Sequence, residues 1–556
     1  MLENKIYSAA GLWKDIDDEG LGFDTTVISD KTEEGGGITK KWVYFNGRKT
    51  QSGECSRILA LIAYKSTKAK LPALVLIPAS GKTIDEPDAS FWAGKGYAVI
   101  AFDNAGECEN SKHTIYPSEI DYANFLRSGR HLSHCDQTAK ETSWYEWAVN
   151  ARRAVTFIRS EPFVKKDEVM ILSVGDGSLI ACMLGAFDSR VTAVAVLSGP
   201  CWIDVDSLIW DDPEERDRWA AAIAPQSYIM SMAVPFYTCA GTNSKEADAV
   251  KTHQALLAAP GGVEKAMLFV PGVVAGGDEN FFSNIDKWFN YARKGEKVPV
   301  PPVSEFEIRD RKLFANVTTQ EGETVKDVKV LFAREGACVS SRYWSELKSV
   351  KDGCNRYTAQ PEIVANGGAA YCFATVTYKG GFAISGNKAT VKEDRLINEV
   401  DFALPSRLVF RGSTGQTPFA SYDPAEFTRP NFFKRNRPQA KKGPFDIDGV
   451  AGNALSTFAL RDPKFVKEAD SILTFDVYSE NEQQLRLYYV KNFGESQQQV
   501  YDFSVELLGG DMWQKISVCP HDFRNETQCR PENWTDCQMF SFVADEEIIV
   551  NNLLFT

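Results

Sequence analysis

The chain has 556 residues, a formal net charge of −13 and a hydrophobic content of 44%. This length exceeds what one hydrophobic core organises, and it predicts roughly three or four domains. The ordinary globular composition excludes a disordered or fibrous protein, and the negative charge argues against nucleic acid as a partner.

Targeting and redox signals are few. No apolar run approaches the roughly 20 residues that span a bilayer, so we expect no membrane insertion. The N-terminal residues 1–7 lack the basic and apolar regions of a secretory signal, which predicts a cytoplasmic location unless a leader was removed. The 12 cysteines are irregularly spaced and are expected to be reduced. We expect no cofactor, and the oligomeric state stays open.

Residues 1–40 are polar and rich in turns, and they predict an irregular lead-in. Over residues 41–302, short apolar runs alternate with helical stretches such as Trp144–Arg159. This alternation predicts an α/β domain with a doubly wound, mostly parallel sheet that helices cover on both faces. The expected strands are Lys41–Asn46, Arg57–Tyr64, Ala73–Ile77, Ala98–Phe102, Val169–Leu172, Ala193–Leu197, Val234–Cys239 and Ala266–Val270.

The proline-rich segment Val298–Val303 closes that domain. Beyond it, apolar and polar residues alternate between Gly, Asn and Asp turns, which predicts two all-β sandwich domains. We expect an immunoglobulin-like sandwich over residues 303–393 and a jelly-roll-like, carbohydrate-binding-like sandwich over residues 394–556. The expected strands are Val328–Phe332, Ala370–Tyr378, Gly381–Ile384, Ile472–Val477, Leu485–Val490, Val500–Leu507 and Gln514–Val518.

One segment carries a family resemblance: Asp167-Glu-Val-Met-Ile-Leu-Ser-Val-Gly-Asp-Gly-Ser-Leu-Ile-Ala resembles the nucleophile elbow of α/β hydrolases. More narrowly, it is similar to the dienelactone-hydrolase and acetyl-xylan-esterase group. The resemblance covers residues 41–302 and implies the α/β-hydrolase fold and, as the family's chemistry, ester hydrolysis; it is specific for fold and not for function. Supporting segments, in the family's order, are Leu71–Pro78, Gly96–Gly106, Phe187–Gly199 and Asp286–Gly295.

The elbow pattern of the family is small-x-nucleophile-x-small, because small flanks let strand and helix approach closely. The matching frame is Ser173-Val-Gly-Asp-Gly177, which places Gly175 at the nucleophile position. Glycine adopts positive φ freely but supplies no nucleophile. A frame shifted by one residue would place Asp176 there, as in dehalogenase-like hydrolases, but it puts Val174 at a small position and is disfavoured.

The other two catalytic positions that the resemblance implies are also occupied by other residues. The acid position, in Gly241-Thr-Asn-Ser, holds Ser244, and the histidine position, in Pro271-Gly-Val-Val-Ala, holds Ala275. Because a triad acts as a unit, three substitutions predict a catalytically inactive esterase relative with a ligand- or carbohydrate-binding role. Two alternatives stay open: an active ester hydrolase with a displaced nucleophile or a metal, and a structural scaffold.

Two sets of residues are candidates for catalysis outside the usual triad positions. Ser173, Ser178 and Cys182 lie near the elbow, but each needs a base within about 2.6–3.2 Å, and we expect packed side chains instead. His131 and His134 would share a face of a helix and could ligate zinc, whose bound water would then hydrolyse without serine. An incidental pair on a surface or lid segment is the expected alternative.

Ligand-binding candidates occur in two domains. Ala79, Ser80 and Gly81 occupy the oxyanion-loop position, where backbone N–H groups can form an anion-binding nest. Asp103 ends a strand at the edge where open α/β sheets bind ligands, although in the family it more often stabilises the turn, and Asp176 is the other candidate there.

In the last domain, Trp513 and Trp534 are the candidates, because exposed tryptophans stack on sugars in carbohydrate-binding jelly rolls. The alternative is that both are core residues, which is at least as common. The expected partner is therefore a carbohydrate or another small molecule.

Overall fold

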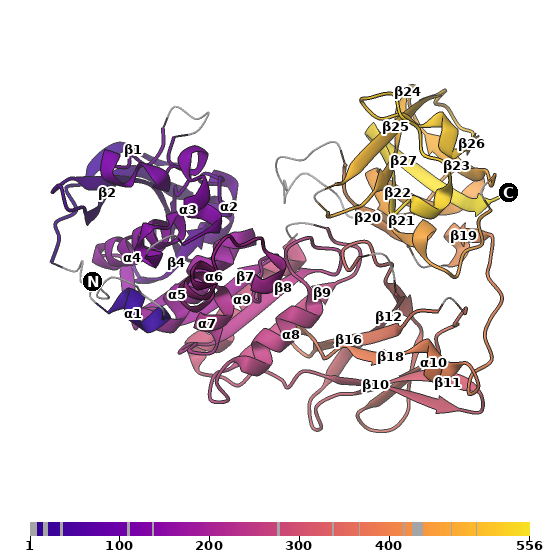
Figure 1. The fold of residues 1–556 in the computed structure, drawn as a ribbon, viewed down its shortest axis with the longest axis horizontal. Coiled ribbons are helices and arrows are strands. Elements are labelled where there is room, and N and C mark those ends of the chain that lie inside the picture. Colours follow the sequence, from indigo (N-terminus) through magenta and orange to yellow (C-terminus); the bar gives the residue numbers. More distant parts are fainter. Residues whose placement is uncertain are drawn as a thin grey trace. The chain divides into compact units, whose positions relative to one another are not determined.

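The computed structural model describes residues 8–14, 20–33, 37–107, 112–135, 138–274, 279–335, 338–365, 367–414, 417–424, 438–468, 470–495 and 497–556. The chain forms two compact units, each described by itself. The first unit comprises Met1–Cys239, Val250–Met267 and Ile285–Val298. The second comprises Ala240–Ala249, Leu268–Asn284 and Pro299–Thr556 (Figure 1).

The strands of the first sheet lie in the order β1-β2-β3-β5-β4-β6-β7-β8-β9. Strands β5, β4, β6, β7 and β8 pair in parallel, whereas β1, β2 and β3 pair antiparallel, and β3 joins β5 antiparallel. The strands are β1 Thr26–Thr32, β2 Ile38–Lys49, β3 Cys55–Lys65, β4 Leu71–Ile77, β5 Ala98–Phe102, β6 Val164–Val174, β7 Ala193–Leu197, β8 Phe236–Gly241 and β9 Lys265–Val270.

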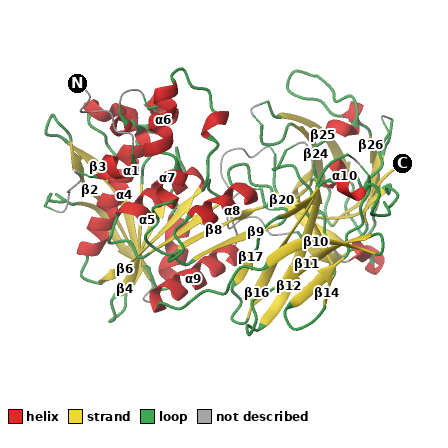
Figure 2. Ribbon diagram, turned by 60° about the horizontal axis from the view of Figure 1, so that its bottom comes forward, coloured by secondary structure: helices red, strands yellow, loops and turns green. Residues whose placement is uncertain are grey.

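Helices cover both faces of this sheet, which is why its central strands are almost continuously apolar (Figure 2). Helices α4 and α5 pack on each other and on the central strands. Helices α2 and α9 meet through Trp92 and Phe289, whose ring centroids lie 6.4 Å apart. Among the described residues, no helix is both long and apolar enough to cross a membrane. The helices are α1 Ala9–Trp13, α2 Glu86–Gly94, α3 Arg130–Ser133, α4 Ser143–Ser160, α5 Ser178–Phe187, α6 Pro213–Ala222, α7 Pro225–Ile229, α8 Ala249–Ala258, α9 Glu279–Lys294 and α10 Glu393–Leu396.

Residues 1–40 are not irregular throughout. They contain α1, whose Leu12 and Trp13 are buried, and β1, which pairs with β2 at the edge of the sheet. Strand β1 has no buried residue, so it lacks the apolar alternation that would have indicated a strand. Backbone pairing with β2 forms it instead.

The immunoglobulin-like sandwich has two antiparallel sheets, β10-β11-β15-β14 and β13-β12-β16-β17, with β18 added to β16. Apolar side chains from both sheets form its core, among them Leu313, Phe332 and Ala374. The strands are β10 Val303–Arg309, β11 Lys312–Thr318, β12 Val325–Arg334, β13 Ser345–Leu347, β14 Ser349–Lys351, β15 Arg356–Ala359, β16 Ala370–Tyr378, β17 Ala383–Ser385 and β18 Ala389–Val391.

The C-terminal sandwich is organised by one long strand, β27. The first part of β27 pairs with β24, its last part pairs with β23, and β22 pairs along both parts with a register shift at Gly452. The strands are β19 Leu408–Phe410, β20 Phe419–Ser421, β21 Gln439–Lys442, β22 Asp448–Thr457, β23 Leu473–Ser479, β24 Gln483–Lys491, β25 Gln499–Leu507, β26 Gln514–Val518 and β27 Met539–Phe555.

The predicted fold class, an α/β sheet followed by antiparallel sandwiches, is confirmed. The domain boundaries at residues 302 and 393 stay predictions. The cysteines in the described part of the chain are all free thiols.

Helix α2 contains a buried acid that makes the stability of the first unit depend on pH. The Asp88 carboxyl is buried, and its Oδ1 atom has no hydrogen-bond partner among the described residues. Burial, with a smaller contribution from Asp85, raises the pKa of Asp88 to about 8.

We expect the urea midpoint of the protein to fall as the pH rises from about 4 to about 8. The unfolded carboxyl ionises near pH 4, whereas the folded one stays protonated until about pH 8, so ionisation favours unfolding within this window. The variant Asp88→Asn should make this fall smaller, and the exposed control Asp167→Asn should leave it unchanged. Identical pH profiles for Asp88→Asn and the unmodified chain would contradict the account.

Candidate functional site

The turn between β6 and α5 has the geometry of a nucleophile elbow. Gly175 has a φ of 56°, the left-handed conformation that glycine adopts most easily, and Asp176 does not share it. A Cβ atom at Gly177 would lie 2.4 Å from the Pro78 carbonyl oxygen, and one at Gly199 would lie 2.2 Å from that of Gly175. These close approaches require small flanking residues and centre the elbow on Gly175.

Asp176 uses its carboxylate inside the site. Its Oδ1 atom accepts a hydrogen bond of 2.7 Å from the Ser80 backbone N–H, and its Oδ2 atom accepts one from the Ser80 hydroxyl. Both residues are partly exposed. The N–H that the resemblance assigns to an oxyanion therefore binds a carboxylate of the same chain.

The oxyanion loop is also covered by an aromatic ring. Gly81 has a φ of 67°, and a Cβ atom there would lie 2.6 Å from the ring of Phe125. Phe125 belongs to a short 3-10 helix, Phe125–Arg127, and its N–H donates to the Ala105 carbonyl at 2.8 Å. Sequence reasoning missed this contact, because nothing in the spacing of the two residues indicates it.

The side chains near the elbow are packed and not activated. Ser178 donates its hydroxyl to the Pro200 carbonyl at 2.8 Å, whereas the buried Ser173 hydroxyl has no partner among the described residues. Burial raises the pKa of Cys182 well above its usual value, and it raises the pKa of Cys201 to about 12. Neither thiol supplies a thiolate at neutral pH.

The residue at the acid position is part of a turn in the second unit. The Ser244 hydroxyl oxygen accepts hydrogen bonds from the N–H groups of Glu246 and Ala247, at 3.3 and 3.2 Å. The preceding Asn243 donates to the carbonyls of Ser340 and Arg342, both at 2.8 Å. Ala275, the residue at the histidine position, lies outside the described residues.

Asp103 stabilises the turn that follows β5. Its carboxylate is buried and accepts hydrogen bonds from the N–H groups of Ala105, Gly106 and Thr114. Burial raises the pKa of Asp103, and these donors counteract the rise in part. This bonding matches the structural role of the family position rather than contact with a ligand.

The two histidines do not lie on one helix, so the shared helical face considered for a zinc site does not form. Helix α3 ends at Ser133, and His134 follows it in an extended conformation. His131 donates from Nδ1 to the Glu141 carbonyl at 2.6 Å, and His134 hydrogen-bonds the Ser133 hydroxyl at 2.6 Å. Within the described ranges, no cluster of three or more His, Cys, Asp or Glu residues is placed to hold a metal ion.

The two candidate tryptophans differ in burial. Trp534 is fully buried in the core of the C-terminal sandwich, and its indole N–H donates to the Ser471 carbonyl at 2.8 Å. Its proposed role as an exposed sugar platform is therefore wrong. Trp513 is partly exposed; its indole N–H donates to the Pro444 carbonyl, and Gly443 lies against its ring.

The strand order, the helices on both faces and the elbow after β6 together define an α/β-hydrolase fold, so the fold that the resemblance implies is confirmed. No family model and no curated protein matches the chain. The solved acetyl xylan esterase from Paenibacillus sp. R4 is similar, with a TM-score of 0.38, 12% identity and coverage of 51% of this chain and 92% of that one.

Two further solved structures are similar to the chain. Acetyl xylan esterase 1 from Thermoanaerobacterium sp. JW/SL YS485 has a TM-score of 0.37 and 14% identity, and the match covers 50% of this chain and 88% of that one. A glucuronoyl esterase from Solibacter usitatus has a TM-score of 0.34 and 12% identity, with 49% and 86% covered. At such identities the likeness concerns the fold alone.

The variant Gly175→Ser tests whether only the nucleophile is missing. We expect no turnover of p-nitrophenyl acetate, because a new serine also needs a base, and Ala275 occupies the histidine position. The variant should lose about 1–2 kcal/mol of stability, because a side chain is strained at positive φ. Gly175→Ala is the matched control for this strain. Turnover by Gly175→Ser alone would mean that a working base is present.

Proposed function

We propose that this chain is a non-hydrolytic relative of the esterases that binds a carbohydrate or another hydroxyl-bearing small molecule. The observation that carries the proposal is the Asp176 carboxylate on the Ser80 N–H. Ester hydrolysis develops negative charge on the carbonyl oxygen, and hydrolases stabilise it with N–H groups of this loop. Here the donor already binds a fixed negative charge.

The charge of the Asp176 carboxylate opposes the negative charge that ester hydrolysis would develop beside it. A vacant oxyanion donor contributes about 2.7–4 kcal/mol to transition-state stabilisation. Two like unit charges about 4 Å apart repel by about 4 kcal/mol at an effective dielectric constant of 20. When a carboxylate occupies the Ser80 N–H, the transition state loses this stabilisation and instead experiences a repulsion of similar size.

The nucleophile and base positions support the same proposal. Gly175 has no side chain to form an acyl intermediate, and Ser178 donates its hydroxyl to a carbonyl rather than to a base. His131 and His134 bond to partners on their own segment. None of these groups forms the hydrogen-bonded pair of nucleophile and base that catalysis requires.

A partly exposed carboxylate suits a ligand that donates hydrogen bonds. Asp176 accepts bonds from Ser80, but an ionised carboxylate has about four acceptor sites, so it can also accept a ligand hydroxyl. The same carboxylate disfavours anions at this place. Hydroxyl-rich neutral molecules, sugars among them, fit this chemistry.

An active hydrolase with a displaced nucleophile is the second candidate. The observation in its favour is the Ser173 hydroxyl, which is buried at the end of β6 and has no hydrogen-bond partner in the described part of the chain. A purely structural scaffold is the third, and it would bind neither esters nor sugars.

Assays with activated esters separate the first two candidates. We expect the full chain to hydrolyse p-nitrophenyl acetate no faster than a heat-denatured control, because it lacks an aligned nucleophile and base. A serine-directed fluorophosphonate should label neither Ser173 nor Ser178 in peptide mass spectra. Turnover that the reagent blocks and that Ser173→Ala abolishes would establish a displaced nucleophile and end the non-hydrolytic proposal.

A glycan array with the full chain separates binder from scaffold. We expect at least one class of oligosaccharide to bind with millimolar to micromolar affinity, about −4 to −8 kcal/mol, as is usual for weak small-ligand contacts. Calorimetry on the strongest hit gives the affinity, and heat-denatured protein is the control. If no glycan binds, the carbohydrate role fails and the scaffold becomes the leading candidate.

A further inference from the structure

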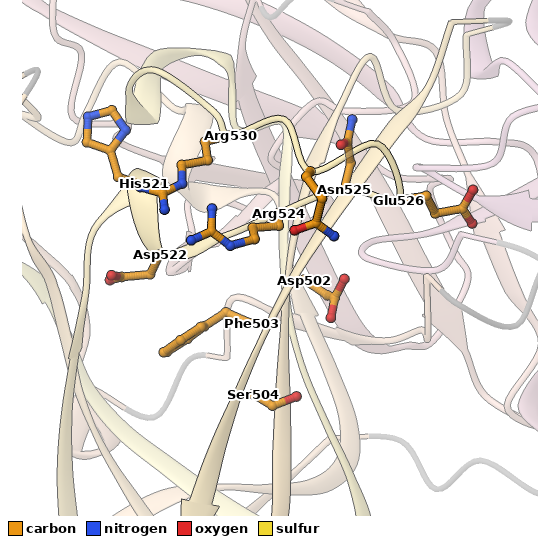
Figure 3. A pocket seen from close by; sticks show the side chains of 10 residues that line it. Asp502, Phe503, Ser504, His521, Asp522, Arg524, Asn525, Glu526 and Arg530 are labelled. Atoms are coloured by element: carbon orange, nitrogen blue, oxygen red, sulfur yellow. The ribbon is translucent and has the colours of Figure 1, made fainter.

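The C-terminal sandwich contains a pocket that sequence reasoning did not single out. It has a volume of about 630 Å³, within the range of about 300–1,000 Å³ that small-molecule sites occupy. Strand β25 contributes Asp502, Phe503 and Ser504, and the segment 521–530 contributes the other lining residues (Figure 3). Neither Trp513 nor Trp534 lines it.

Hydrogen bonds hold the backbone around the pocket in place. Asp502 and Arg524 exchange backbone bonds of 2.9 and 3.1 Å, which join the segment 521–530 to β25. The Asn525 side chain accepts from the N–H groups of Thr527 and Cys529, at 3.1 and 2.8 Å, and closes the following turn. The Asp522 carboxylate accepts from the Cys519 N–H at 2.7 Å. The pocket is therefore built before any ligand arrives.

The two arginines of the pocket form no ion pair with the carboxylates that the structure describes. Arg524 and Arg530 form no ion pair or hydrogen bond through their guanidinium groups with any part of the chain that the structure describes. Both groups extend to the same side of the pocket, where His521 also lies (Figure 3). Two neighbouring guanidinium groups can bind a carboxylate, because each arginine can donate two parallel hydrogen bonds to its oxygens.

The remaining lining residues have a different chemistry. The carboxylates of Asp502 and Glu526 lie on the other side from the guanidinium groups (Figure 3). Phe503 is partly buried, with its ring centroid 5.9 Å from that of Phe523 and part of its surface in the pocket. An aromatic surface and acceptors for hydroxyl groups are what a sugar ring requires.

We infer that this pocket binds a sugar acid, with its carboxylate on Arg524 and Arg530 and its ring against Phe503. The inference rests on the proposed carbohydrate-binding role and adds to it a second site, in the C-terminal sandwich, with its own class of ligand. The hydroxyls of the sugar donate to Asp502. Polyanions such as nucleic acids and heavily sulfated chains are disfavoured, because the carboxylates of Asp502 and Glu526 repel any negative charge beyond the first.

Calorimetry with the full chain and two matched probes tests the inference. The probes are the methyl glycoside of galacturonic acid, which carries one carboxylate, and its methyl ester, which has the same ring without the charge. We expect the acid to bind at least about ten-fold more tightly, because hydrogen bonds between two charged groups are stronger than those to a neutral ester. Added salt should reduce this preference.

The variant R524Q/R530Q should lower the affinity for the acid to that for the ester. Both side chains reach the surface of the pocket, so the variant should keep the circular dichroism spectrum and melting temperature of the unmodified chain. Lys515→Gln, which removes one exposed cation of β26 outside the pocket, is the control for a general loss of positive charge and should bind the acid normally.

Five results would overturn the inference. Equal binding of acid and ester, or binding of the acid that survives in R524Q/R530Q, would exclude the arginine pair. Inorganic sulfate that displaces the acid at equal concentration would assign the pocket to simple anions. Binding of neutral glycans alone would leave the proposed function intact and refute this site, whereas binding of no glycan at all would refute both.

Discussion

The hydrogen bond from the Ser80 N–H to the Asp176 carboxylate is the contact on which the chemistry of the first unit depends. It joins the loop after β4 to the elbow after β6, two segments that are neighbours because β4 and β6 pair in parallel. In a hydrolase the substrate oxygen completes this arrangement during the reaction. Here the protein completes it in the resting state, with a charge-assisted bond of about 1.5–3 kcal/mol.

This arrangement separates the structural role of the elbow from its catalytic role. The turn is tight because Gly177 lies against the Pro78 carbonyl and Gly199 against that of Gly175. Those contacts set the distance between β6, α5 and the strands beside them, so they are needed whatever residue occupies the turn. Glycine at position 175 removes the strain that a larger residue would store there. The geometry of the turn therefore does not depend on a catalytic side chain at position 175.

Sequence reasoning predicted the features that depend on local pattern. The central strands were expected within a few residues because they are buried on both faces, and α4 because its apolar residues recur at helical spacing. Strand β1 was missed because none of its residues is buried. Strands β13 and β14 were missed because three residues are too few to show an alternation of apolar and polar side chains. The sequence does not indicate whether Trp534 is buried or exposed, because tryptophan occurs in both environments in strand-rich segments. The structure shows it buried.

The candidate site was predicted in its positions but not in its contacts. Gly175, Ser244 and Ala275 follow from a motif, whereas the bond between Ser80 and Asp176 joins residues 96 positions apart and has no local signature. The nest expected at residues 79–81 was regarded as free for an external anion. Its central N–H is satisfied by Asp176, which becomes evident only when the two loops are side by side.

Whether a charge is satisfied within the chain decides what each region can bind. At the elbow, the N–H and hydroxyl groups of Ser80 already donate to the Asp176 carboxylate. An external anion would therefore gain little binding energy there. In the C-terminal pocket, Arg524 and Arg530 form no ion pair with the described carboxylates, so an external carboxylate finds two unpaired guanidinium groups. Donors that bond only to water in the free protein can contribute to ligand binding. Donors that are already bonded within the protein contribute less, because those bonds must be broken first. By this argument, anion recognition belongs to the sandwich pocket, and the elbow is left for neutral hydroxyl groups.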